Sequence, residues 1–187
     1  MRYFVSRHIP PFDRTLLVES GSRHLIEDLL PGIYDHHPDA QVDLVTCYAG
    51  LPKTFQNGRG QVWRVTDYPD GASRQRLYAE LGARRHTVCG MVCSGEPIMT
   101  KWKWMLALRS PGKLFILNEN GDYFWADRSE WRTMRHFALF RAGLDGAGAV
   151  RTLARLLLFP LTLSYLLLYA GWVHARRKPR RGIPAGT

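Results

Sequence analysis

The sequence lacks the features that mark several common functional classes. Its three cysteines, Cys47, Cys89 and Cys93, form no zinc pattern because no second pair of ligands accompanies them. We expect reduced core cysteines, no metal site and no cofactor. The triple-glycine motif of a dinucleotide site is also missing. The apolar run Tyr3 to Val5 is too short for a signal-peptide core, so nothing at the N-terminus predicts export.

Acidic residues are scarce as well. The chain has 16 Asp and Glu against 26 Lys and Arg, which gives a formal net charge of +10. Five of the basic residues follow His174, namely Arg176, Arg177, Lys178, Arg180 and Arg181. A polybasic run beside an apolar segment is typical of attraction to anionic lipid headgroups. Membrane lipid is therefore the expected partner, and nucleic acid is not.

Charged residues are absent from 156 to 173, a stretch that includes eight leucines. About 18 helical residues reach about 27 Å, close to the hydrocarbon core of about 30 Å. A buried core helix is the alternative, but such helices seldom lack polar residues for so long. Pro160 also leaves a kinked or re-entrant helix open, since it removes a backbone hydrogen bond. We predict a membrane segment at 156 to 173 and a basic tail at 174 to 187.

The rest of the chain, residues 1 to 142, alternates strand and helix patterns. Apolar or β-branched runs predict strands at 15–18, 42–47, 62–66, 87–93 and 114–117. Helices are expected near 25–33, through 77–81, from Pro97 to about Arg109, and at 128–142. This alternation implies an α/β fold with a Rossmann-like parallel sheet and flanking helices. Residues 143 to 155 are expected to link the domain to the membrane segment.

Ligands of doubly wound sheets bind beyond the carboxyl ends of the strands, where this sequence is rich in polar residues. The candidate ligand-binding residues are Ser20, Gly21, Ser22, Arg23, Asp67, Ser94, Gly95, Lys101, Asn118, Asn120 and Asp122. The turns 20–23 and 94–97 are expected to open helices, whose free N–H groups suit a phosphate. Ordinary N-capping by their serines is the alternative.

Glu96 and Glu119 are the candidate catalytic bases, because carboxylates at this edge could accept a proton from a bound substrate. Each has a simpler interpretation. Glu96 could be a first-turn acid favoured by the helix dipole, and Glu119 could belong to a turn around Asn120-Gly121. We expect Glu19, Asp67, Glu96 and Glu119 to line one crevice.

The order of these elements resembles the N-terminal half of the heptosyltransferase-like glycosyltransferases, members of the two-domain GT-B group. The resemblance runs from residue 13 to about residue 128. It rests on Leu16 to Arg23, Pro31 as the end of the first helix, Val42-Asp43-Leu44-Val45, Val62-Trp63-Arg64-Val65-Thr66-Asp67, and the strand entering Ser94-Gly95. The segments Cys93 to Trp104 and Leu117 to Trp125 also resemble a bacterial membrane-protein family of unassigned function.

Two departures from the glycosyltransferase family shape the functional expectation. The family places an aspartate, its proposed base, directly after the first-turn glycine, whereas Ser22 follows Gly21 here. The family binds its nucleotide-sugar mainly with a C-terminal Rossmann domain, in whose place this sequence has the apolar segment. The resemblance therefore implies a membrane-anchored accessory or acceptor-binding module of bacterial cell-envelope polysaccharide synthesis. It would work with a separate glycosyltransferase chain and not as an autonomous glycosyltransferase.

Two other functions stay open. One is a membrane-bound enzyme acting on a phosphate-containing or nucleotide-sugar substrate, with Glu96 or Glu119 as its base. The other is a membrane-tethered regulatory domain that binds a nucleotide. For all three functions we expect the protein to be located in the bacterial inner membrane, with the soluble domain on the cytoplasmic side. A domain of this size without a signal peptide is not expected to be translocated.

Overall fold

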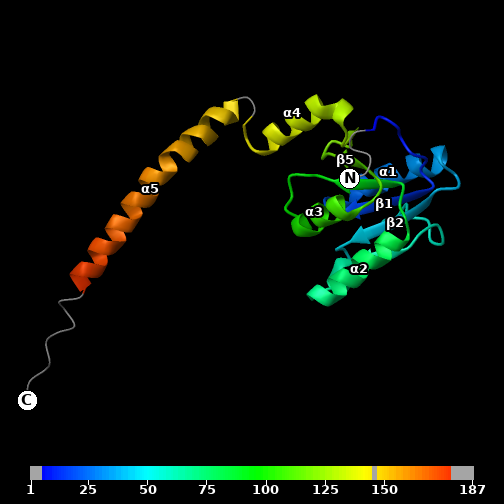
Figure 1. Cartoon of the computed structure of the whole chain (residues 1–187), viewed down its shortest axis with the longest axis horizontal. Helices are drawn as coiled ribbons and strands as arrows, with labels where there is room; N and C mark the ends of the chain where they lie inside the picture. Colours follow the sequence, from blue (N-terminus) through cyan, green and yellow to red (C-terminus); the bar gives the residue numbers. More distant parts are fainter. Residues whose placement is uncertain (1–5, 145–146, 178–187) are drawn as a thin grey trace, which may run out of the picture. The chain divides into compact units, whose positions relative to one another are not determined.

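The computed structural model describes residues 6–144 and 147–177, and the chain divides into two compact units between Arg135 and His136 (Figure 1). The first unit is built on a six-stranded sheet with the order β3-β2-β1-β4-β5-β6. Its strands are β1 (Arg14–Glu19), β2 (Gln41–Thr46), β3 (Val62–Arg64), β4 (Val88–Val92), β5 (Lys113–Leu117) and β6 (Tyr123–Trp125). The first five are parallel, which confirms the expected α/β fold, and β6 pairs antiparallel with β5.

Helices cover both faces of this sheet (Figure 1). Helix α1 (Arg23–His36) packs on one face, where Leu17, Leu44 and Phe115 of the strands join its core cluster. Helices α2 (Gly71–Ala83) and α3 (Thr100–Arg109) pack on the other face. Strand side chains point alternately to the two faces, so strands buried on both sides are nearly all apolar. The sequence therefore shows these strands as short apolar runs.

Helix α1 corrects one expectation. Pro31 does not end the first helix but lies inside it, and the helix continues to His36. A proline has no N–H for the carbonyl four residues earlier, which here belongs to Glu27. The hydroxyl of Thr54, in the β2–β3 connection, donates to that carbonyl at 2.9 Å. The same loop donates the Lys53 N–H to the Glu27 carboxylate at 2.8 Å, so it compensates for the proline from outside the helix.

We expect Thr54→Val to lower the free energy of unfolding by about 1 kcal/mol, because the Glu27 carbonyl loses its donor. Chemical denaturation of the full chain in mild detergent measures this loss. In a Pro31→Ala background, the substituted residue supplies the missing backbone N–H, so the same Thr54 substitution should cost much less. Equal losses in the two backgrounds would contradict this explanation.

Two other boundaries differ from the sequence-based expectation. Helix α3 begins at Thr100, not Pro97, after Met99 adopts a left-handed conformation with φ of 51°. The turn 94–97 therefore does not open a helix, because a left-handed residue interrupts the chain before the first helical turn. The expected strand 62–66 is also shorter, since Val65–Asp67 form a 3₁₀ helix, η1.

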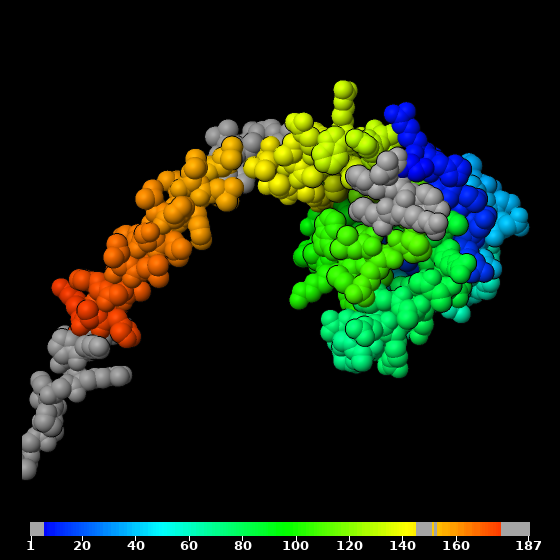
Figure 2. Space-filling view, in the orientation of Figure 1, coloured from blue at the N-terminus to red at the C-terminus, as the bar shows by residue number. Residues whose placement is uncertain are grey.

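The C-terminal part of the chain is helical. After the 3₁₀ helix η2 (Arg128–Glu130), α4 (Trp131–Arg141) crosses the boundary between the two units, and α5 (Ala147–Arg177) follows. The expected linker, 143 to 155, thus overlaps the start of α5. Pro160 lies inside this helix. From Leu153 to Arg176, α5 is long and apolar enough to cross a membrane, and its large apolar side chains, such as Leu157 and Leu168, are exposed (Figure 2).

Candidate functional site

The sheet has a topological switch point between β1 and β4. The chain leaves β1 into α1 on one face and leaves the neighbouring β4 toward α3 on the other. The two connections diverge at the carboxyl ends of these strands, which is where ligands of open α/β sheets bind. The turn that follows β1 contains Ser20, Gly21 and Ser22, and the turn that follows β4 contains Ser94, Gly95 and Glu96.

The two turns are in direct contact. The Ser22 hydroxyl donates to Glu96 Oε2 at 3.0 Å, and the Ser94 hydroxyl donates to the same oxygen at 3.4 Å. Ser22 stands at the N-cap of α1, yet its side chain makes no capping hydrogen bond, because its hydroxyl is used by Glu96. A Cβ on Gly21 would lie 2.5 Å from Val92 Cγ1, so only glycine lets the first turn pack this closely.

Arg23 has a structural partner at this edge. Its Nε donates to Glu19 Oε1 at 2.8 Å, and Glu19 is fully buried. The guanidinium also donates to the carbonyls of Ala49 and Gly50, at 3.0 and 3.3 Å, and stacks over the Tyr48 ring. Arg23 therefore fastens the β2–β3 connection to β1, and its charge is already paired with Glu19.

Lys103 is a residue of this site that the sequence analysis did not identify. Its side chain is 6% exposed, and its ammonium donates to the Ser20 carbonyl at 3.3 Å. Among the described residues, no carboxylate lies within 4.0 Å of this ammonium. A buried ammonium without an acidic partner is costly, and anionic ligands are one way to offset that cost. The sequence offered one signal of this burial, because Lys103 lies on the same helical face as the apolar residues Met99 and Leu106.

The remaining sequence candidates do not gather at the switch point. Asn118 Oδ1 accepts hydrogen bonds from the N–H groups of Asn120 and Asp122, and its amide donates to Asp122 Oδ2, so these side chains close the β5–β6 turn. Gly121 has φ of 84°, as such a turn requires. Glu119 belongs to the same turn. Lys101 is exposed at the start of α3.

Asp67 lies at the far end of this edge. It is exposed and follows β3, which is two strands from β1 in the sheet order. The end of β3 and the end of β5, which Glu119 follows, are four strand spacings apart, or about 19 Å. Glu19 is buried and paired with Arg23. The four acidic residues therefore lie along one edge of the sheet but do not line one crevice, so that expectation was wrong. Glu19 and Glu96 lie at the switch point, and of these two Glu19 is buried in its pair with Arg23.

A second polar cluster lies elsewhere on β2. Asp43 Oδ2 accepts from His86 Nε2 at 2.8 Å and from Arg84 Nε at 2.5 Å, and Oδ1 accepts from the Gln61 N–H at 2.7 Å. Burial alone would raise the pKa of Asp43, but these hydrogen bonds outweigh it and lower the pKa. His86 Nδ1 has no partner among the described residues. His86 lines a cavity of about 20 Å³, which has room for one water molecule but not for a substrate, so we assign this cluster a structural role.

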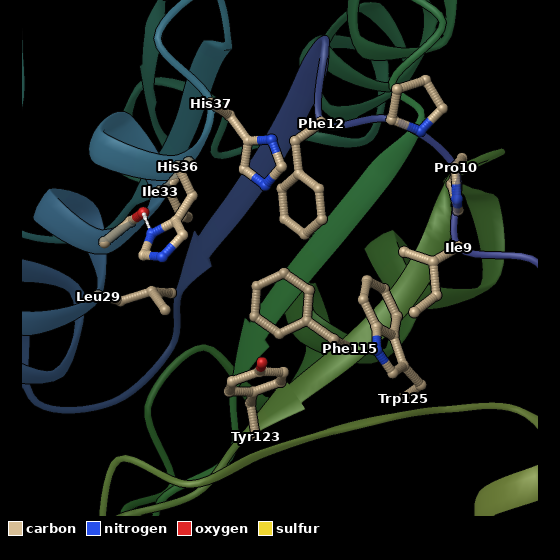
Figure 3. Close-up of a pocket in the computed structure, with 12 residues that line it drawn as sticks. Ile9, Pro10, Phe12, Leu29, Ile33, His36, His37, Phe115, Tyr123 and Trp125 are labelled. Atoms are coloured by element: carbon tan, nitrogen blue, oxygen red, sulfur yellow. Dashed lines mark hydrogen bonds between the residues drawn. The ribbon is translucent and has the colours of Figure 1, made fainter.

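A second, larger cavity lies on the α1 face of the sheet. It has a volume of about 630 Å³ and is lined by Ile9, Pro10, Pro11, Phe12, Leu29, Gly32, Ile33, His36, His37, Phe115, Tyr123 and Trp125. Figure 3 shows the rings of Phe12, Phe115 and Trp125 around this space, with Leu29 and the histidines on the side of α1. None of the lining residues is an acid, a lysine or an arginine.

No group of three or more His, Cys, Asp or Glu residues that could hold a metal ion occurs within 6–144 and 147–177. Cys89 is fully buried, and burial raises the pKa of its thiol to about 12, so it is not a nucleophile at neutral pH. Comparisons of the chain with protein-family models, with curated proteins and with solved structures found no match.

Proposed function

We propose that this protein is a membrane-anchored, Rossmann-like module of bacterial cell-envelope polysaccharide synthesis that binds a phosphate-bearing sugar ligand for a separate glycosyltransferase chain. The observation that carries the proposal is the ammonium of Lys103, which is buried against the turn Ser20 to Ser22 with no carboxylate partner among the described residues. The strand order β3-β2-β1-β4-β5 supports the Rossmann-like assignment, because dinucleotide-binding sheets use this order.

Three features of the turn suit an anionic group. The first turn of α1 has no side-chain cap, so the positive end of the helix dipole faces the turn, although the Leu25 N–H already donates to the Ser22 carbonyl at 3.2 Å. Lys103 adds a full positive charge beside the same turn. The Ser22 and Ser94 hydroxyls stand close by and can exchange their bonds to Glu96 for bonds to a ligand.

The anchor supports the membrane part of the proposal. The charge-free stretch 156–173 of α5, with basic residues before and after it, is typical of a membrane span. Anchoring at the cytoplasmic face of the inner membrane would hold the module beside enzymes that act on envelope precursors.

We expect phosphate-bearing sugars to raise the melting temperature of the full chain in mild detergent. The probes are UDP-glucose, ADP-glucose and glucose 1-phosphate, each titrated in a thermal shift assay. A ligand at about 100 times its Kd adds about 2.7 kcal/mol of stability by mass action. Lys103→Met should abolish the shift, since it removes the buried charge. Lys53→Met, at an exposed lysine of the β2–β3 connection, is the matched control and should keep it.

The absence of any shift with all three probes, or an equal shift in Lys103→Met, would contradict the proposal. One observation favours the enzyme alternative. Glu96 brings a carboxylate within 3.0 Å of Ser22, the position at which the glycosyltransferase family has its aspartate. If the purified chain turns over a nucleotide-sugar without a partner and Glu96→Gln removes this activity, the enzyme alternative is correct.

A further inference from the structure

The cavity on the α1 face is the feature of the domain that the proposed function leaves unused. Helix α1 covers β1, β2 and part of β4 on this face, whereas Phe115 on β5 and Trp125 on β6 border the open space instead of a helix. Figure 3 shows Ile9 and Pro10 across this space from Leu29 and His36 of α1. We propose that this cavity binds the hydrocarbon chain of a single-chain anionic amphiphile from the membrane, the chemical class of a free fatty acid.

The walls of the cavity match a hydrocarbon chain. Ile9, Leu29 and Ile33 provide aliphatic contacts, and the rings of Phe115 and Trp125 pack edge to face with centroids 5.7 Å apart. A volume of about 630 Å³ lies within the range of pockets that enclose a small molecule. Because no acid, lysine or arginine lines the cavity, a sugar or phosphate would lose its hydration there without gaining an ionic partner.

Polar atoms at the edge of the cavity suit a small anionic head. His36 Nδ1 is bonded to the Gly32 carbonyl at 2.8 Å, which leaves Nε2 without a partner among the described residues. The His37 ring stacks on Phe12 at 4.4 Å between centroids, and no hydrogen bond to its nitrogens occurs within the described chain. His37 can donate its imidazole N–H to a carboxylate, and His36 can donate through Nε2 in its imidazolium form, so these two residues are the expected contacts of the head.

The membrane is the source of this ligand because of helix α5. An apolar helix long enough to span a bilayer keeps the domain close to the membrane, which raises the effective concentration of membrane amphiphiles at the cavity. A single hydrocarbon chain partitions reversibly between a bilayer and an apolar site, since burial of its CH₂ groups is favourable in either place. This inference rests on the membrane anchor of the proposed function but not on its sugar-phosphate site, which lies at the carboxyl edge of the sheet.

The experiment uses the full chain in lipid nanodiscs with a photoactivatable palmitate that carries a diazirine in its chain. After irradiation, mass spectrometry of the digested protein locates the crosslinks. We expect two sites: α5, which contacts lipid, and the cavity residues on α1, β5 and β6. An excess of unlabelled palmitate should suppress the cavity crosslinks, because a saturable pocket is emptied by competition.

Gly32→Trp supplies the decisive variant. Gly32 lines the cavity, and a Cβ there meets no atom within 4 Å, so an indole can fill the space without displacing the backbone. It should abolish the cavity crosslinks and leave those on α5. Gly71→Trp, at a helical glycine that also has no neighbour within 4 Å, should retain both. Circular dichroism checks folding, and Leu29→Trp replaces Gly32→Trp if that variant does not fold.

Crosslinks confined to α5 in the wild type would overturn the inference. Cavity crosslinks that persist unchanged in Gly32→Trp or Leu29→Trp would also overturn it. If the cavity is not labelled and the protein dimerises through this face, the inference is also wrong and the face belongs to a contact between two copies. The thermal shift with sugar phosphates should be the same in Gly32→Trp and the wild type, so failure of one proposal can be told from failure of the other.

Discussion

Replacing Lys113 with methionine is expected to lower the free energy of unfolding by about 3 to 5 kcal/mol, the cost of leaving a buried charge without its partner. Lys113 Nζ lies 2.7 Å from Asp127 Oδ2, and the two side chains are 1% and 4% exposed. The same ammonium donates to the carbonyls of Ser6 and His8, at 3.0 and 3.1 Å. One lysine thus joins the N-terminal segment to β5 and to the segment that follows β6.

Urea denaturation of the full chain in detergent measures this loss. Lys101→Met is the matched control, because Lys101 is exposed, and should change stability by less than about 0.5 kcal/mol. Adding Asp127→Asn to Lys113→Met should restore part of the stability, since the amide is uncharged and can still accept the hydrogen bond from the Ser129 N–H. A loss below about 1 kcal/mol in the single variant would show that the pair is not important for stability.

The same pair predicts how acid acts on the domain. Burial alone would raise the pKa of Asp127, but hydrogen bonds from Lys113 and Ser129 outweigh it and lower the pKa from 3.8 to about 2. A carboxyl group with a lowered pKa stabilises the folded state fully above its unfolded value. The contribution of Asp127 should therefore be complete above about pH 4 and should be lost as the pH falls toward 2. Urea denaturation across this pH range measures it, and Asp127→Asn should lack this part of the acid dependence.

Truncation after Leu144 is expected to release the protein from membranes. The truncated chain lacks α5, whose eight leucines between 156 and 173 together favour insertion by about 4 kcal/mol. Carbonate extraction followed by sedimentation separates the two outcomes, since a spanning protein stays in the pellet and the truncated one should move to the supernatant. Sedimentation of the truncated protein with the membranes would place the anchor elsewhere.

Truncation removes the basic tail together with the apolar stretch, so a full-length variant is needed to test the apolar stretch alone. Arginine at both Leu163 and Leu167, near the centre of the apolar stretch, should oppose insertion by about 5 to 7 kcal/mol and release the protein. Phenylalanine at the same two positions keeps the stretch apolar and should leave the protein in the pellet. Retention of the arginine variant under carbonate would show that α5 does not span the bilayer.

Local patterns predicted much of the fold and less of the site. The parallel strands could be predicted because each is a short apolar or β-branched run, buried on both faces in all but β3. Strand β6 was missed, because Tyr123 to Trp125 is only three residues long and is defined by its pairing with β5. The predicted end of the first helix was wrong because the local effect of Pro31 is offset by Thr54, which is distant in the sequence.

In the candidate site, too, local patterns predicted the positions of residues but not their contacts. The polar residues at the strand ends could be placed on one edge from the parallel topology alone, but their roles depend on partners. The Ser22 hydroxyl bonds to Glu96 and does not cap its own helix, Arg23 is paired with Glu19, and Asn118 closes a turn. Lys103 was missed as a site residue because its place on an apolar helical face indicates burial only, whereas its bond to Ser20 follows from the packing of α3 on the sheet.

The sequence by itself determined the apolar helix and the alternation of strands and helices, because both follow from composition and periodicity over a few consecutive residues. Only the tertiary structure decided which charges are paired, where a positive charge is buried without a carboxylate among the described residues, and which face of the sheet stays open beside Phe115. These properties come from contacts between residues far apart in the chain, and no local pattern encodes the distance between two such residues.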